Sequence, residues 1–357
     1  MYKKLFIPGP THVREPILEA QTEPMIGHRS QEYADLQAEV TPKLQKLLYT
    51  EQPVFIYTAS GTGVMEGAIR QTVQKRALIP VCGAFSDRWY TIAEANGVPV
   101  DRVDVDWGQG FTPEILDQAL AQDDYDVLTV TYNETSTGVM NPLKDIAAMV
   151  RDKYPDVVIL VDAVSAMAGA KIEFDDWDLD VVISSSQKCF ALPPGLAITA
   201  VSERAIKRAE QIPGRGYYFD FLNMLKYYKR SQTPATPAIS LIRALNAQMD
   251  AILEEGLENR WARHIEMAEI VRSWARRHWA LFPDERFLSN TVTTIKNTRG
   301  VSIADLNTEL GQRGAMISNG YGSKLREKTF RIAHMGDLTS DDIRWVLSLI
   351  DDVLGLA

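Results

Sequence analysis

Cysteine is scarce in this sequence, and basic residues are outnumbered by acidic ones. Cys82 and Cys189 are the only two cysteines among 357 residues, and they form no Cys-x-x-Cys pair. A disulfide framework or a zinc knuckle is therefore not expected. Lysine and arginine total 38 against 47 aspartates and glutamates, a formal net charge of −9. This balance argues against nucleic acid or an anionic membrane surface as a partner.

Long apolar runs are also missing. No stretch approaches the ~20 apolar residues of a membrane-spanning helix, and residues 1–8 lack the apolar run of a signal peptide. We therefore expect a cytoplasmic protein. The five histidines show no spacing typical of metal ligands, so no metal site is expected. They are His12, His28, His264, His278 and His334.

Short apolar segments alternate with helix-length stretches through the first two thirds of the chain. The apolar segments are rich in Val, Ile and Leu without clean alternation, as expected for strands covered on both faces. They are Val54–Ala59, Ala77–Val81, Asp126–Thr131, Val157–Asp162, Val181–Ser184 and Leu196–Val201. The helix-length stretches between them are Gly63–Gln74, Ser86–Asn96, Pro113–Ala121 and Leu143–Tyr154. This pattern predicts an α/β fold whose large domain, residues 1–240 with an N-terminal arm at 1–20, holds a mostly parallel sheet flanked by helices.

The remaining residues, 241–357, follow a different pattern. Two long amphipathic stretches, Ala238–Glu254 and Glu258–His278, predict helices. A strand-like Thr291–Lys296, a helix-like Ser302–Gln312 and a strand-like Lys328–Ala333 follow. Thr339 with Asp342 is typical of a capping box that opens a last helix, through Leu354. We expect this part to be a smaller α+β domain.

Asp162 ends one of the predicted buried strands. A carboxylate there is costly unless a cation pairs with it. A pyridinium nitrogen is a suitable cation, because the carboxylate keeps it protonated and so preserves the ring as an electron sink. A helix N-cap or an internal salt bridge is the structural alternative, and this residue taken alone leaves it open.

Lys188 follows another strand end, within Ser184–Gly195. Burial disfavours the charged form of a lysine, and the neutral amine is the nucleophile that forms an imine with a carbonyl compound. The alternative is a partly exposed loop lysine with no chemical role, but the neighbouring polar clusters favour the chemical role.

Two further polar clusters come after predicted strands. The first, Ser60-Gly61-Thr62-Gly63, precedes a predicted helix, and a helix N-terminus with nearby glycines can bind an anion. The second is the loop Asn133–Gly138. Each of these alone is equally compatible with an ordinary turn. Because ligands of α/β sheets bind beyond the carboxyl ends of the strands, all the clusters together predict one site there.

Taken in order, these residues resemble the class V aminotransferases, a family of fold type I pyridoxal-phosphate enzymes. The alanine–glyoxylate and serine–pyruvate or serine–glyoxylate aminotransferases are the most similar members. The resemblance covers nearly the whole chain, in the segments Pro8–Thr11, Ile26–Arg29, Ser60–Gly63, Asn133–Gly138, Val161–Ser165, Ser186–Lys188, Pro193–Gly195 and Phe330–Gly336. It implies a large domain with a seven-stranded, mostly parallel sheet and pyridoxal 5′-phosphate as the cofactor.

The resemblance also implies a role for each matching residue. Lys188 and Asp162 are the implied catalytic residues: Lys188 would carry the cofactor as a Schiff base, and Asp162 would pair with its pyridine nitrogen. Phe85 would stack on the ring, and Arg331, with His28, would bind the substrate. The residues implied at the phosphate are Ser60, Gly61, Thr62 and Ser186, and those near the ring hydroxyl are Thr135 and Gln187.

A homodimer is implied as well, with the site at the subunit interface. Gln232, Thr233 and Thr236 match a segment that reaches the neighbouring subunit's phosphate in the family. The alternative for each is a polar, proline-rich surface loop. Three positions depart from the family pattern and bear on substrate choice: Phe85 where tryptophan is common, Tyr132 where histidine is common, and the loop Ser318–Gly322.

The function implied is transfer of an amino group from alanine or serine to glyoxylate or pyruvate by a ping-pong mechanism. Other class V activities are the alternatives, namely a phosphonate aminotransferase or a lyase or desulfurase. A non-catalytic binding protein with the same fold is a further alternative. A desulfurase needs an exposed, mobile cysteine, whereas Cys189 is expected to point away from the ring, because neighbours on an extended chain alternate faces.

Overall fold

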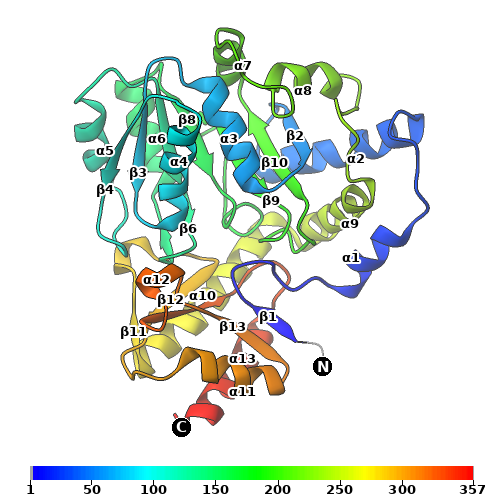
Figure 1. The fold of residues 1–357 in the computed structure, drawn as a ribbon. Helices are drawn as coiled ribbons and strands as arrows, with labels where there is room; N and C mark the ends of the chain where they lie inside the picture. The colour runs from blue at the N-terminus through cyan, green and yellow to red at the C-terminus, as the bar shows by residue number, and fades with distance from the viewer. Residues whose placement is uncertain (1–2, 357) are drawn as a thin grey trace.

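The computed structural model describes residues 3–356 as a large α/β part and a smaller α+β part below it in the view of Figure 1. The large part holds a seven-stranded sheet in the order β2-β10-β9-β8-β5-β3-β4. Its strands are β2 (Val54–Thr58), β3 (Ala77–Val81), β4 (Val100–Asp104), β5 (Val127–Thr131), β8 (Val158–Asp162), β9 (Val181–Ser185) and β10 (Leu196–Val201). Only β10 runs antiparallel to its neighbours, so the predicted mostly parallel sheet is confirmed.

Helices cover both faces of this sheet, which explains why its inner strands are buried on both sides. One face packs against α2 (Gln31–Leu48), α5 (Pro113–Leu120), α6 (Leu143–Lys153) and α9 (Ile239–Glu255). The other packs against α3 (Gly61–Thr72), α4 (Ala84–Ala95), α7 (Glu203–Glu210) and α8 (Phe221–Tyr228). The edge strand β4 escaped sequence prediction because its run Val-Asp-Arg-Val-Asp is short, polar and partly exposed.

The smaller part is a five-stranded sheet in the order β1-β13-β14-β12-β11. Its strands are β1 (Lys4–Phe6), β11 (Ala280–Leu281), β12 (Val292–Lys296), β13 (Ala315–Asn319) and β14 (Thr329–Ala333). It packs against α10 (Leu257–His278), α11 (Ile303–Gln312) and α13 (Ser340–Leu354), and α12 (Gly322–Leu325) lies in the β13–β14 connection. The predicted capping box of Thr339 and Asp342 opens α13.

The N-terminal strand was not predicted in this second sheet. Residues Lys4–Phe6 pair in parallel with Ala315–Ile317, so the two ends of the chain share one sheet (Figure 1). The chain then passes through α1 (Glu15–Glu19) and η1 (Ala20–Thr22) into α2. The predicted division of the chain at residue 240 stays a prediction, and α9 is continuous across it.

The carboxyl ends of the central strands meet at one edge of the large sheet. The register places Thr131 of β5 beside Asp162 of β8, and Asp162 beside Ile183 of β9. The loops that follow these strands therefore converge, and one of them contains the short hairpin β6 (Asn133–Glu134) and β7 (Val139–Met140). Arg331 of β14 donates a hydrogen bond to the carbonyl of Thr135 in this hairpin (3.2 Å), so the smaller sheet closes over the same edge. The remaining short helix, η2 (Glu285–Phe287), follows β11. None of the helices within residues 3–356 has the length and apolar character to cross a membrane.

Candidate active site

Lys188 lies under the N-terminal segment of the chain. Its ammonium donates a hydrogen bond to the carbonyl of Pro8, and its own carbonyl accepts one from the hydroxyl of Thr11 (2.9 Å). Gly9 has a φ of +102°, and a Cβ there would lie 2.6 Å from the lysine Cδ. Only glycine combines that backbone conformation with so close an approach to the lysine side chain.

Asp162 and Lys188 both have pKa values shifted toward neutrality. Burial raises the pKa of Asp162 to about 6, and within residues 3–356 its carboxylate accepts a hydrogen bond only from the backbone N–H of Val164 (2.9 Å). Burial, with the nearby Arg331 adding to it, lowers the pKa of Lys188 to about 8. A neutral amine is therefore accessible near physiological pH, as imine formation requires.

The N-terminus of α3 lies beside this pair without a side-chain cap. Ser60 occupies the N-cap position but its hydroxyl makes no capping hydrogen bond, which leaves helix N–H groups free for an anion. A Cβ on Gly61 would lie 2.7 Å from Val164 Cγ2 and 3.6 Å from Ser185 Oγ, so glycine keeps this approach open. The hydroxyl of Thr62 accepts a hydrogen bond from Arg88 (3.1 Å).

Ser185 is a candidate that the sequence analysis missed. Its buried hydroxyl has no hydrogen-bond partner in the part of the chain that the structure describes, and it faces the start of α3. The predicted Ser186 is instead engaged locally: its hydroxyl donates to the carbonyl of Pro193 (2.7 Å) and accepts from Leu196 N–H (3.1 Å). Ser185 is the last residue of β9, whereas Ser186 lies in the turn after it, so the two hydroxyls have different surroundings.

The ring of Phe85 lies near the amine of Lys188, 6.0 Å from the ring centroid. Its backbone is fixed by Glu134, whose fully buried carboxylate accepts hydrogen bonds from the N–H groups of Phe85 (3.0 Å) and Ser86 (2.8 Å). A carboxylate at a helix N-terminus is favourable, and here it anchors the first turn of α4. Glu134 thereby sets where the Phe85 ring stands, a role that sequence reasoning did not assign.

Arg331 is buried beside Thr135 on the opposite side of the site. Its guanidinium donates to the carbonyls of Thr135 (3.2 Å) and Asn319 (3.1 Å), and burial lowers its pKa to about 10. The hydroxyl of Thr135 lies 2.6 Å from that of Ser165. Gln187 is half-buried, and its carbonyl accepts from Thr11 N–H (3.0 Å). Arg331 therefore offers a charged group held by neutral partners, which suits an anionic ligand.

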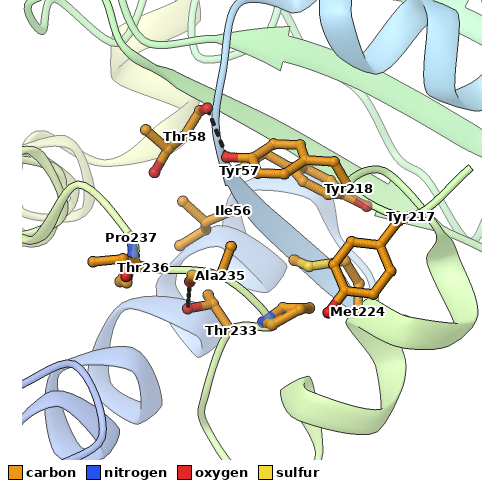
Figure 2. A pocket seen from close by; sticks show the side chains of 11 residues that line it. Ile56, Tyr57, Thr58, Tyr217, Tyr218, Met224, Thr233, Ala235, Thr236 and Pro237 are labelled. Carbon is orange, nitrogen blue, oxygen red and sulfur yellow. Dashed lines mark hydrogen bonds between the residues drawn. The ribbon is translucent and has the colours of Figure 1, made fainter.

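The predicted inter-subunit residues lie elsewhere on the chain. Thr233 and Thr236 line a surface pocket with Thr58, Tyr217 and Tyr218, and the hydroxyl of Thr233 donates to the carbonyl of Ala235 (2.8 Å), as Figure 2 shows. Tyr217 is 72% exposed.

The same segment is tied to the loop before α2. Arg29 donates to the side chain of Gln232 (3.2 Å) and to the carbonyl of Thr233 (2.5 Å). His28 precedes Arg29 in that loop and is half-buried. The contacts of the adjacent Arg29 therefore place His28 near the Gln232 segment.

Both cysteines are buried and free. Burial raises the pKa of Cys82 and of Cys189 to about 12. Neither thiol can supply a thiolate at neutral pH, so the desulfurase alternative gains no support from them.

The chain belongs to the class V aminotransferases. The family model for class V aminotransferases matches residues 17–338. The fold therefore carries the pyridoxal-phosphate fold type I architecture, and the family implies pyridoxal phosphate as cofactor.

Named relatives agree with this membership. The chain is 34% identical to an L-aspartate–glyoxylate aminotransferase of Paracoccus denitrificans, over 94% of this chain and 87% of the relative. It is 31% identical to a serine–glyoxylate aminotransferase of Arabidopsis thaliana, over 98% and 90%. Among solved structures, an aspartate aminotransferase of Thermus thermophilus matches with a TM-score of 0.90 and 30% identity, covering 98% of this chain and 99% of that one.

The residues present fit pyridoxal phosphate. Among the described residues, the buried carboxylate of Asp162 has only a backbone donor and the hydroxyl of Ser185 has no partner. The glycine at the start of α3 leaves space beside uncapped N–H groups. These are the groups that a pyridinium nitrogen and a phosphate require.

Proposed function

We propose that this chain binds pyridoxal phosphate through Lys188. It then moves an amino group from a small donor, alanine or serine, to glyoxylate or pyruvate by a ping-pong mechanism. The observation that carries the proposal is the pair of half-buried Lys188 and buried Asp162, whose pKa values are shifted in opposite directions beside an uncapped helix N-terminus. The names of the glyoxylate aminotransferases among the relatives support the choice of acceptor.

In this proposal each residue has a defined task. Arg331 binds the α-carboxylate of the donor, which orients the α-hydrogen toward Lys188. The neutral Nζ of Lys188 takes the proton from the α-carbon. When bound, pyridoxal phosphate would supply an electron sink for the pair left by that proton. Asp162 would pair with the ring nitrogen and keep it protonated, and Phe85 would pack against the ring.

The phosphate is assigned to the start of α3. Ser60, Gly61 and Thr62 are proposed to bind it, and Ser185 supports the proposal better than Ser186, because only Ser185 has a free hydroxyl. Thr135 and Gln187 are proposed near the ring hydroxyl.

A homodimer belongs to the proposal. Gln232, Thr233 and Thr236, with His28 close by, would reach the site of the neighbouring subunit, and the exposed Tyr217 beside them supports an interface there. The cytoplasmic location expected from the sequence stays a prediction.

Visible absorbance tests the proposal directly. Purified protein loaded with pyridoxal phosphate is mixed with L-alanine or L-serine in the absence of any oxo acid. We expect the lysine-bound absorbance band to disappear stoichiometrically and to return on addition of glyoxylate or pyruvate. A band that both amino acids leave unchanged would overturn the small-donor proposal while leaving the cofactor in place. Failure of Lys188→Ala to abolish the starting band would overturn the role of Lys188.

A further inference from the structure

A second arginine, Arg88, contacts the same tyrosine, Tyr321, as Arg331 does. Each contact of Arg88 recorded within residues 3–356 is to a neutral group: the hydroxyl of Thr62 (3.1 Å), the hydroxyl of Tyr321 (3.4 Å) and the ring of Phe85, 4.7 Å from the guanidinium carbon to the centroid. Arg102, by contrast, is paired with Asp87 and Asp104 on the same side of the sheet. A half-buried arginine held only by neutral groups retains the capacity to bind an anion.

Tyr321 joins the two arginines. Its hydroxyl accepts from Arg88, its ring lies 5.1 Å from that of Phe85, and its ring centroid lies 5.5 Å from the guanidinium carbon of Arg331. The side chain thus spans the space between the proposed α-carboxylate site and the second cation. Tyr321 belongs to the loop Ser318–Gly322, where the sequence departs from the family pattern.

The loop that carries Tyr321 is held rigidly at both ends. A Cβ on Gly320 would lie 2.0 Å from the carbonyl of Leu325, so the turn is too tight for any other residue. On the far side, Lys324 lies 4.1 Å from the ring centroid of Trp107, which connects this loop to the large part of the molecule. Tyr321 is therefore a preorganised wall of the site, as a specificity contact requires.

Arg88 also lies within electrostatic range of the reacting groups. Its charge lowers the pKa values of both Lys188 and Asp162, although burial is the largest influence on each. Arg88, Arg331 and Lys188 together surround Phe85 and Tyr321 with positive charge.

We propose that Arg88 and the hydroxyl of Tyr321 form a subsite for a second anionic group on the substrate. The enzyme then prefers amino donors with a side-chain carboxylate, such as aspartate, over alanine. This inference rests on the proposed aminotransferase function and changes its preferred donor, because it ranks dicarboxylic amino acids above the small neutral donors alanine and serine. A donor carboxylate held by Arg331 and a side-chain anion held by Arg88 would fix the substrate at two points, which favours one orientation of the α-hydrogen.

Single-turnover kinetics of the cofactor-loaded enzyme test the subsite. We measure kcat/KM for L-aspartate and for L-alanine, and the dissociation constants of maleate and acetate, which bind without reacting. Aspartate is expected to be the better donor by about tenfold or more, because one additional charge-assisted hydrogen bond forms. Arg88→Gln is expected to lower the aspartate-to-alanine ratio about 10- to 100-fold and to weaken maleate binding more than acetate binding. Tyr321→Phe keeps the ring and is expected to lower the ratio about threefold.

Controls separate this reading from its rivals. Arg88→Lys retains the charge and should restore part of the ratio, and Arg102→Gln removes an arginine that is already paired and should leave the ratio unchanged. An equal loss for both donors with weaker retention of pyridoxal phosphate would assign Arg88 to the cofactor phosphate and overturn the subsite. An unchanged ratio and unchanged maleate affinity would also overturn it. If the unmodified enzyme converts neither donor, the proposed function fails, and the effect of Arg88→Gln on maleate relative to acetate still decides the subsite.

Discussion

Two regions of this molecule hold charged side chains away from solvent. In one region these charges lack oppositely charged partners, and in the other they are paired. At the carboxyl edge of the large sheet, Asp162, Lys188 and Arg331 have no oppositely charged hydrogen-bond partner among the residues that the structure describes. Burial moves all three pKa values toward neutrality: up to about 6 for Asp162, down to about 8 for Lys188 and down to about 10 for Arg331.

The second region is a network between α9, α10 and the segment after β14. Arg260, of which 1% is exposed, donates to Asp337 (3.1 Å) and Glu255 (2.9 Å). Asp337 also accepts from Arg14 (2.6 Å) and Gln248 (3.0 Å). Burial alone would raise the pKa of Asp337, but Arg260 and Arg14 hold it below its usual value.

The contrast separates charges kept for the fold from charges kept for a ligand. In the network each charge is neutralised by a neighbour, and Arg260 additionally donates to the carbonyl of Cys189 (2.8 Å), next to the proposed catalytic lysine. At the sheet edge the isolated charges lower the stability of the folded protein, because each has lost part of its hydration without gaining a partner. A bound cofactor and substrate can supply those partners and so stabilise the folded state.

The largest expected effect is that of Asp162→Asn, which should reduce turnover and increase stability together. We expect kcat to fall about 1000-fold, because the ring nitrogen loses a buried anionic partner worth several kcal/mol. A carboxyl whose pKa is raised by folding is unstrained below pH ~4 and destabilises the native state above its folded pKa. At pH 7.5 the cofactor-free variant should therefore be more stable, by about 1–3 kcal/mol.

Urea unfolding of the cofactor-free protein and steady-state turnover measure these two effects. Asp180→Asn is the matched control, because Asp180 is equally buried but paired with Arg151 and Arg204. That variant should lose stability. A loss of the same size in Asp162→Asn would contradict the distinction between the two kinds of buried charge.

The next effect is on stability alone and comes from the network. Arg260→Met should lower the free energy of unfolding by about 3–5 kcal/mol, because it leaves Asp337 and two carbonyls without their buried cation. Arg276→Met, in the same helix, removes an exposed arginine paired with Glu285 and should cost less than about 1 kcal/mol. Similar losses for the two variants, measured by urea unfolding, would show that the network contributes no more than a surface ion pair.

The sheet edge could be predicted from sequence, whereas the network could not. Asp162 is the last residue of β8, and Lys188 lies in the loop that follows β9, so a local pattern places both where parallel strands bind their ligands. The mostly parallel sheet flanked by helices is also confirmed, and it could be predicted because its strands are short apolar runs in the sequence. The individual roles of the site residues stay predictions.

The network joins Arg14, Gln248, Arg260 and Asp337, which lie far apart in the sequence and carry no common motif. Their pairing depends on how α9 and α10 pack against the segment after β14, and no local pattern encodes that. Arg88 was missed for a related reason. It donates a hydrogen bond to Tyr321, which is more than 200 residues away, and the sequence does not show that the two residues meet.

The smallest and sharpest test concerns the pKa of Lys188. Only the neutral amine captures pyridoxal phosphate, so the capture rate of cofactor-free protein should rise with pH and level off above about 8, where burial places this pKa. A solvated lysine would keep gaining up to pH ~10.5. Stopped-flow absorbance measures the rate, and Lys188→Ala supplies the background from other lysines. Asp162 raises the pKa of Lys188 electrostatically, so Asp162→Asn should move the inflection to lower pH. An inflection near pH 10 in the unmodified protein would mean that Lys188 is solvated like a surface lysine, and the sheet edge would then hold no strained charge.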